Sequence, residues 1–307
     1  MSKLLAYLQL FRLPNVFTAI ADVAMGFLLT HDMQLFQASP ATVGPFLLIV
    51  VASALLYTAG MVLNDVFDVE QDRAERPDRP IPSGRVPLGF ARVLGFQMLI
   101  LGIACGFAAS YFVGDARPGL LAVALAACVF VYDAWAKRTP LGPIAMGGCR
   151  FLNALLGMSL ASFAWDAGNW MVAAGLGIYI VGVTWFARTE ARESSRAHLS
   201  LATVVMGVGL GLLWWFPDWT TRVTAPSNWL FFWVVIGLLI LWRCVRAIAA
   251  PVPGNVQQAI KQCILSLIVL DAAVAYAAQG TQGIMWAVAV LALLIPTMYL
   301  GRWVYST

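Results

Sequence analysis

The feature that most constrains this chain is its series of long apolar runs, separated by short segments that hold most of the charged residues. Each run has roughly 17–23 residues, which is enough for a helix to cross a hydrocarbon layer of about 30 Å. Charged residues make up only 11% of the 307 positions. Because a soluble domain has about 25% charged residues, this chain cannot cover a water-facing surface.

The pattern predicts an all-α fold, a polytopic bundle of about nine to ten transmembrane helices, and a single membrane domain over residues 1–307. The expected spans lie near 14–30, 44–63, 88–110, 118–135, 143–163, 169–187, 198–216, 228–245, 260–279 and 283–301.

The basic residues predict the orientation. If the N-terminus is cytoplasmic, all of the 19 basic residues except Arg117 and Arg222 fall on the cytoplasmic side of the membrane. This asymmetry satisfies the positive-inside rule. We therefore expect a multi-pass protein of a bacterial cytoplasmic membrane, with both termini and the charged motif loops in the cytoplasm. The net charge of +4 is explained by this distribution, and a nucleic-acid partner is not expected.

An acidic segment follows the second run. Asp65, Asp68 and Asp72 stand at i, i+3 and i+7, so on a helix their carboxylates share one face, with Asn64 at its edge. Carboxylates stacked in this way repel one another unless a cation neutralises them. Their hard oxygen ligands suit magnesium, which commonly bridges to substrate phosphates. The alternative is a solvated charged loop that only enforces topology.

The sequence NDVFDVEQDRAERPDRPIPSGRV, which begins at Asn64, resembles the first signature motif of the UbiA superfamily of intramembrane prenyltransferases. This resemblance implies an all-helical enzyme, usually with nine spans, that moves a prenyl group from its diphosphate to an aromatic or other lipophilic acceptor with the help of Mg²⁺. It also implies that Asn64, Asp65, Asp68 and Asp72 hold magnesium and diphosphate. Arg79 would then help to position the loop.

Two further segments fit the resemblance. Family members carry a tyrosine followed by a lysine that contacts the diphosphate, and Tyr132 with Lys137 matches this pattern, with Arg138 as a substitute for the lysine. The alternative is an interfacial aromatic residue followed by topology-setting cations. Arg150 and Asn153 stand at i and i+3 on a membrane helix, where a polar pair normally lines a cavity or a helix contact.

The first span contains Asn15 and Asp22 on one face. By resemblance, Asn15 contributes to the substrate cavity. Asp22 lies about two turns into the apolar run, so it faces either a polar cavity or an interhelical partner, and the sequence leaves both open.

A second acidic motif is expected after the sixth span, and the sequence there is GVTWFARTEARESSR. Glu190 and Glu193 stand where the family has aspartates and could bind a second magnesium. Arg188 begins an arginine stripe that could bind diphosphate without metal. The alternative is a topology-setting loop with compensating acids. This segment is similar to the UbiA-like EboC subgroup.

These observations predict a prenyltransferase in which Asp65, Asp68, Asp72, Glu190 and Glu193 are catalytic metal-binding residues. The expected substrates are a prenyl diphosphate and a lipophilic, aromatic acceptor, both reached from the lipid bilayer. The atypical second motif keeps a second hypothesis open: a UbiA-type fold that serves as a carrier, transport or assembly factor for a lipophilic metabolite. A channel is disfavoured, because the acids cluster at one end of the helices and do not follow a pore.

Overall fold

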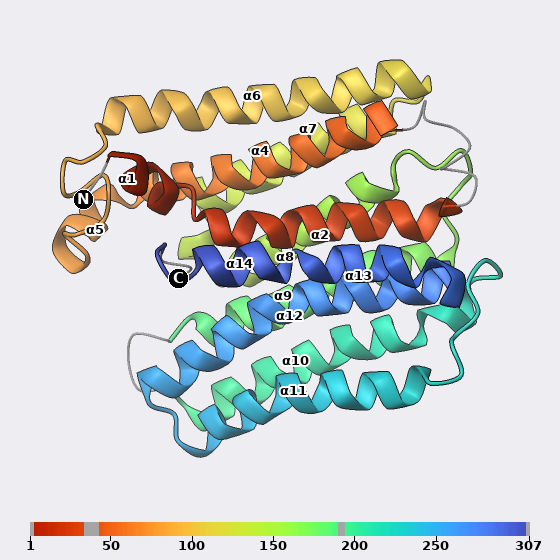
Figure 1. The fold of residues 1–307 in the computed structure, drawn as a ribbon. Helices are drawn as coiled ribbons and strands as arrows, with labels where there is room; N and C mark the ends of the chain where they lie inside the picture. Colours follow the sequence, from red (N-terminus) through yellow and green to blue (C-terminus); the bar gives the residue numbers. More distant parts are fainter. Residues whose placement is uncertain (1–2, 34–42, 190–193, 305–307) are drawn as a thin grey trace.

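The computed structural model describes residues 3–33, 43–189 and 194–304. The described part is a bundle of roughly parallel and antiparallel helices without strands (Figure 1). The helices are α1 (Lys3–Leu10), α2 (Leu13–Thr30), α4 (Val43–Phe67), α5 (Val69–Glu75), α6 (Leu88–Val113), α7 (Arg117–Ala134), α8 (Gly142–Met158), α9 (Ala167–Ala187), α10 (Arg196–Trp215), α11 (Trp229–Ala249), α12 (Pro253–Gln279), α13 (Ile284–Ala292) and α14 (Leu294–Leu300).

Eight of the described helices are long and apolar enough to cross a membrane: α2, α4, α6, α7, α9, α10 with the short turn after it, α11 and α12. Large apolar side chains such as Ile100, Phe231 and Leu238 are exposed on the outer helices. In water such a surface would be an aggregation hazard, so it is a surface for lipid. The protein is an integral multi-pass membrane protein with the predicted all-α fold.

The two remaining apolar runs differ in detail from their predicted spans. The run near 283–301 is divided into α13 and α14 at Leu293, because Pro296 has no amide hydrogen to donate one turn back. The run near 143–163 ends as a helix at Met158. The segment after it folds back as a loop whose carbonyl groups at Ala161 and Phe163 accept hydrogen bonds from Arg117.

Helix α2 lies at the centre and packs against α4, α8, α12 and α14, whereas α6 and α11 lie at opposite edges (Figure 1). Glycines allow α2 and α8 to approach closely. A Cβ atom on Gly157 would lie 2.4 Å from the Val23 carbonyl oxygen, and one on Gly26 would lie 2.6 Å from that of Ala154. Small residues of this kind are the usual means of close helix contact in membranes. They bring the polar residues of α2 and α8 together.

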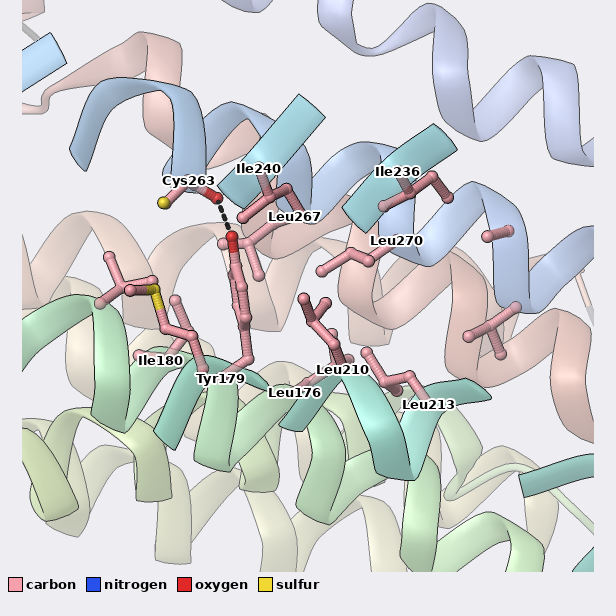
Figure 2. Close-up of a cluster of buried hydrophobic side chains, with 14 of the residues drawn as sticks. Leu176, Tyr179, Ile180, Leu210, Leu213, Ile236, Ile240, Cys263, Leu267 and Leu270 are labelled. Atoms are coloured by element: carbon pink, nitrogen blue, oxygen red, sulfur yellow. Dashed lines mark hydrogen bonds between the residues drawn. The ribbon is translucent and has the colours of Figure 1, made fainter. Parts of the chain in front are cut away.

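On the other side of the bundle, α9, α10, α11 and α12 enclose an apolar cluster that includes Leu176, Leu210 and Ile236 (Figure 2).

The ends of the helices are marked by ordinary stop and start residues. Gly114 ends α6 in the left-handed conformation, and Asp166 caps α9 through the backbone amide of Asn169.

The two ends of the bundle hold different sets of charged residues. Figure 1 places α1 and α5 at one end. Arg117 and Arg222 lie together at the other, where both contact Phe163. There the hydrogen bond from Arg117 lowers the pKa of Asp115 in the turn between α6 and α7.

The existence of a single domain over 1–307 stays a prediction.

Candidate active site at the α4–α5 junction

The acidic motif lies where α4 passes into α5. Asp68 leaves the helical conformation, with φ −96° and ψ 7°, but the backbone hydrogen-bond pattern continues on both sides of it. The Asp68 amide donates to the Asn64 carbonyl at 3.0 Å, and the Asp72 amide donates to the Asp68 carbonyl at 2.8 Å. The helical register that the spacing predicts is therefore kept. Asp65 and Asp72 are both buried, at 3% exposure.

Each aspartate of the motif is paired with a cation from another part of the chain. Arg79 bridges two of them, with its Nη1 atom 3.3 Å from Asp65 Oδ1 and 2.7 Å from Asp72 Oδ2. Lys137 Nζ lies 2.7 Å from Asp68 Oδ2, and Arg138 lies 3.4 Å from Asp68 Oδ1. The motif, the loop after it and the segment after α7 thus form one charged cluster.

Arg12 joins this cluster from the break between α1 and α2, with its Nη2 atom 3.2 Å from Asp65 Oδ1. Its backbone adopts φ 44° and ψ 47°, a left-handed conformation that is uncommon for a residue with a side chain. Backbone strain of this kind is concentrated at functional sites. Sequence reasoning assigned Arg12 no role of its own, because a backbone conformation leaves no signal in residue spacing.

The residues after α7 also contact α4. Lys137 Nζ lies 3.4 Å from the Asn64 carbonyl oxygen, and Arg138 donates to the Phe67 carbonyl at 2.9 Å. The Asn64 side chain donates to Asp133 Oδ1 at 2.9 Å. Tyr132 and Asp133 line a cavity of about 50 Å³ between α2, α4, α7 and α8. We call it the cavity below the α4–α5 junction, because it lies on the side of the junction toward the middle of the bundle. The analysis of the sequence assigned no role to Asp133.

Arg150 and Asn153 lie deeper in the bundle, where they are 7% and 4% exposed. Arg150 donates to Asp22 Oδ2 at 2.9 Å and to Thr18 at 2.7 Å. Asn153 donates to the same Asp22 oxygen at 2.9 Å. Of the two alternatives for Asp22, the structure shows the interhelical partner.

Two residues of α4 complete this network. Ser53 Oγ donates to Asn153 Oδ1 at 2.7 Å, and the Arg150 guanidinium lies 5.4 Å above the centre of the Tyr57 ring. Both residues line the cavity below the α4–α5 junction, as do Arg150 and Asn153. Polar positions on an otherwise apolar helix could have indicated Ser53 and Tyr57 in the sequence.

Asn15 is not among the described residues that line this cavity, and its contribution to a substrate cavity stays a prediction. It lines a separate hollow of about 220 Å³ between α2, α12 and α14, together with Lys261 and Arg302. Asn15 still reaches the central network, because its side chain hydrogen-bonds Tyr57.

The second motif is only partly described. Arg188, at the end of α9, donates to the carbonyl oxygen of Thr139, so it lies beside the segment that carries Lys137 and Arg138. Glu190 and Glu193 lie outside the described residues, and their roles as metal ligands stay predictions.

The donor set of the first motif fits magnesium in chemical type. In the part of the chain that the structure describes, no three acidic, histidine or cysteine side chains converge closely enough to hold a metal ion by themselves. Magnesium usually takes one or two carboxylates, keeps several waters and bridges to substrate phosphates. A metal ion that enters with a diphosphate therefore fits Asn64, Asp65, Asp68 and Asp72.

The model of the UbiA prenyltransferase family matches residues 24–250. This chain belongs to the UbiA prenyltransferase family. The matched range contains both the first motif and the segment of Glu190 and Glu193. The glutamates that stand in place of aspartates in the second motif therefore occur in a member of this family.

Relatives in this family include two digeranylgeranylglyceryl phosphate synthases. The protein from Saccharolobus solfataricus is 38% identical over 33% of this chain and 34% of its own length. The one from Ignicoccus hospitalis is 34% identical over 53% of this chain and 49% of its own length. The chain thus spans at most about half the length of these curated relatives.

A solved UbiA homolog from Archaeoglobus fulgidus bound to GPP and Mg²⁺ has a TM-score of 0.64 to this structure, with 15% identity over 94% of this chain and 99% of that one. At this identity the likeness shows the shared fold. The resemblance to the EboC subgroup is not tested by these relatives and stays a prediction.

Proposed function

We propose that this protein is a magnesium-dependent intramembrane prenyltransferase that moves a prenyl group from a prenyl diphosphate to a lipophilic acceptor. The observation that carries the proposal is the cluster at the α4–α5 junction. There Asp65, Asp68 and Asp72 keep helical register, and each is paired with a cation of another segment. Such a cluster offers carboxylates to a metal and guanidinium groups to phosphate oxygens.

When bound, magnesium would be held by Asn64, Asp65, Asp68 and Asp72, and it would supply electrophilic assistance to the departing diphosphate. The chain's own cations act beside it. Arg79, Lys137 and Arg138 exchange a carboxylate partner for phosphate oxygens and so stabilise the negative charge of the leaving group.

The reaction breaks the bond between C1 of the prenyl group and the diphosphate oxygen, with the electron pair leaving on the diphosphate. The acceptor forms a new bond to C1 and loses the proton of the atom that attacks. The cavity below the junction is lined by apolar groups such as Met61, Leu125 and Val129, which exclude water from the allylic centre.

For the acceptor we propose an alcohol on a glyceryl phosphate type of lipid in place of an aromatic ring. Support comes from relatives named for a product with two geranylgeranyl groups on glyceryl phosphate. We also propose that the α4–α5 end faces the cytoplasm, because that orientation puts all basic residues except Arg117 and Arg222 on the cytoplasmic side.

The test is binding and turnover in lipid nanodiscs with radiolabelled geranyl, farnesyl and geranylgeranyl diphosphates, with magnesium present or chelated. We expect magnesium-dependent binding and, with an alkylglycerol phosphate acceptor, a labelled ether product. The Asp68→Ala/Asp72→Ala variant should lose both. Asp78→Ala is the matched control, because Asp78 is an exposed aspartate of the same loop.

Binding without any product, across a pool of acceptors from host membranes, would favour the carrier hypothesis. Equal binding by the wild type and the Asp68→Ala/Asp72→Ala variant would contradict the assignment of the site itself.

A further inference from the structure

A second and larger hollow lies at the end of the bundle that carries α1 and α5. It is formed by the start of α2, the first half of α12 and the end of α14, and we call it the α2–α14 hollow. Figure 1 places the start of α2, the start of α12 and the end of α14 at this end. The volume is about 220 Å³, against about 50 Å³ for the cavity below the α4–α5 junction. It therefore has room for a group much larger than a water molecule.

Two cations line the α2–α14 hollow. Lys261 belongs to α12 and Arg302 follows α14, and no acidic residue is among the described lining residues. Both cations are exposed, and neither forms an ion pair or a side-chain hydrogen bond with a described residue. By contrast, the cations around the acidic motif are paired with its aspartates. The hollow thus holds two positive charges that the described part of the chain leaves without a counter-charge.

The rest of the lining is largely apolar. It includes Ile264 and Leu265 of α12 and Met298 of α14, and Met298 is 58% exposed on a face that lies against lipid. Cations beside apolar surface at the end of a membrane bundle suit an amphiphile, because its anionic headgroup meets the cations while its hydrocarbon packs on the apolar groups.

The number of cations indicates which anion fits. A phosphate monoester carries about −1.5 to −2 charges at neutral pH, which two cations can neutralise. The phosphodiester of a common bilayer phospholipid carries only one negative charge. A prenyl diphosphate needs magnesium and its carboxylate ligands, and the described lining of the hollow offers no carboxylate. The charge pattern therefore fits a monoester best.

The α2–α14 hollow adjoins the site at the α4–α5 junction. Asn15 lines the hollow, and its side chain hydrogen-bonds Tyr57, which lines the cavity below the junction. The Asn15 amide also donates to the Arg12 carbonyl at 2.9 Å, and the Arg12 guanidinium contacts Asp65. One helical turn of α2 thus separates the hollow from a cation of the acidic motif.

We propose that Lys261 and Arg302 bind the phosphate group of the acceptor, a lipid phosphate monoester, in the α2–α14 hollow. This inference rests on the proposed prenyltransferase function and assigns residues that select its second substrate. The Arg302 guanidinium offers a fork of donors to phosphate oxygens, and the Lys261 ammonium adds a compact charge. The two phosphate-bearing substrates are then distinguished by chemistry, the diphosphate by magnesium and carboxylates and the monoester by cations without metal.

The test is equilibrium binding of two radiolabelled probes to the protein in phosphatidylcholine nanodiscs, with magnesium chelated and partition into empty nanodiscs subtracted. One probe is 1-O-octylglycerol 3-phosphate and the other is 1-O-octylglycerol, which lacks the phosphate. We expect the wild type to bind the phosphate probe about tenfold more tightly, the effect of charge-assisted hydrogen bonds at a partly exposed site. Lys261→Gln/Arg302→Gln should bind both probes alike, and Arg302→Lys, which keeps the charge, should retain most of the preference.

Arg92→Gln/Arg246→Gln is the matched control. It removes the same charge from two exposed residues of α6 and α11 that are not among the described residues of the hollow, so it should keep the full preference. Equal binding of the two probes by the wild type would overturn the proposal, and so would an undiminished preference in Lys261→Gln/Arg302→Gln or an equal loss in the control. Displacement of the probe by phosphatidylglycerol as effective as that by unlabelled probe would show a general site for bilayer phospholipids and would also overturn it.

Magnesium-dependent binding of geranylgeranyl diphosphate in the same nanodiscs tests the proposed function separately. Lys261→Gln/Arg302→Gln should keep this binding and, in turnover, should raise the KM of the acceptor about tenfold without changing the KM of the diphosphate. If the wild type binds the diphosphate but does not distinguish the probes, the role of the hollow falls and the prenyltransferase assignment stands. If the wild type does not bind the diphosphate, the proposed function has failed, and the acceptor site fails with it.

Discussion

The bundle has two fully buried centres of opposite character. The polar centre consists of Thr18, Asp22, Ser53, Arg150 and Asn153, which join α2, α4 and α8 by hydrogen bonds of 2.7–2.9 Å. The apolar centre, among α9, α10, α11 and α12, contains Leu176, Leu210, Leu213 and Ile236 around Tyr179 (Figure 2).

The two centres differ in the free-energy cost of burying their side chains. At the apolar centre the buried Tyr179 hydroxyl donates one hydrogen bond, to the Cys263 carbonyl oxygen at 3.0 Å, and no charged side chain is among the described residues of the buried cluster around it. The polar centre buries a charged pair that apolar residues of similar volume could replace without loss of stability. Because this expensive centre lies directly beside the cavity below the α4–α5 junction, we interpret it as part of the site and the apolar centre as its scaffold.

The largest effect is expected when the charged pair of the polar centre is broken. Arg150→Met leaves Asp22 buried without its cation, and this should lower the free energy of unfolding by about 3–5 kcal/mol. Denaturation with SDS in mixed micelles measures the change. The double variant Asp22→Leu/Arg150→Met removes both charges and should recover most of the stability but not the activity. If Arg150→Met is as stable as the wild type, the loss of the cation does not leave Asp22 as a costly buried charge, and the prediction is wrong.

A smaller effect is expected from a cavity in the apolar centre. Leu176 is 0% exposed, and Leu176→Ala should cost about 2 kcal/mol, since in lipid the loss is mainly one of packing contacts and not of transfer from water. The activity of each folded molecule should be unchanged. Prenyl transfer at saturating substrate, divided by the folded fraction, is the measurement. A loss of activity beyond the loss of folded protein would contradict the scaffold role.

A third effect, on function more than on stability, is expected at Ser53. Ser53→Ala removes the hydrogen bond to Asn153 and should cost about 1 kcal/mol or less of stability. Because Asn153 lines the cavity, its displacement should lower kcat/KM several-fold. Steady-state kinetics with both substrates varied separates this loss from the stability change. An unchanged kcat/KM would place Ser53 with the scaffold.

The sequence predicts the membrane helices and the acidic motif. It does not predict the contacts between helices that are far apart in the chain, because these depend on how the helices pack. Run length and the acidic spacing identify the membrane helices and Asp65, Asp68 and Asp72, because both depend on local periodicity. The Asp22–Arg150 pair joins residues 128 positions apart, so its register depends on the crossing of α2 and α8.

Asp133 was not assigned a role for a related reason. Its burial and free oxygen follow from the packing of α7 against α4, and neither has a local pattern. The pairing of Asp65 with Arg12 likewise depends on a left-handed backbone conformation at Arg12, which the neighbouring sequence does not indicate.

The smallest effect is expected from the matching deletion in the apolar centre. Tyr179→Phe removes one buried hydrogen bond, as Ser53→Ala does, and should cost about 0.6 kcal/mol, the average for such bonds within a bilayer. The hydroxyl group donates to a carbonyl of α12 (Figure 2), and Tyr179 is not among the described residues that line the cavity, so kcat/KM should equal that of the wild type. SDS denaturation and steady-state kinetics on the two variants side by side make the comparison. If the two variants lose similar stability but only Ser53→Ala loses kcat/KM, the chemistry lies at the polar centre. If Tyr179→Phe loses as much kcat/KM as Ser53→Ala, the division between site and scaffold is wrong.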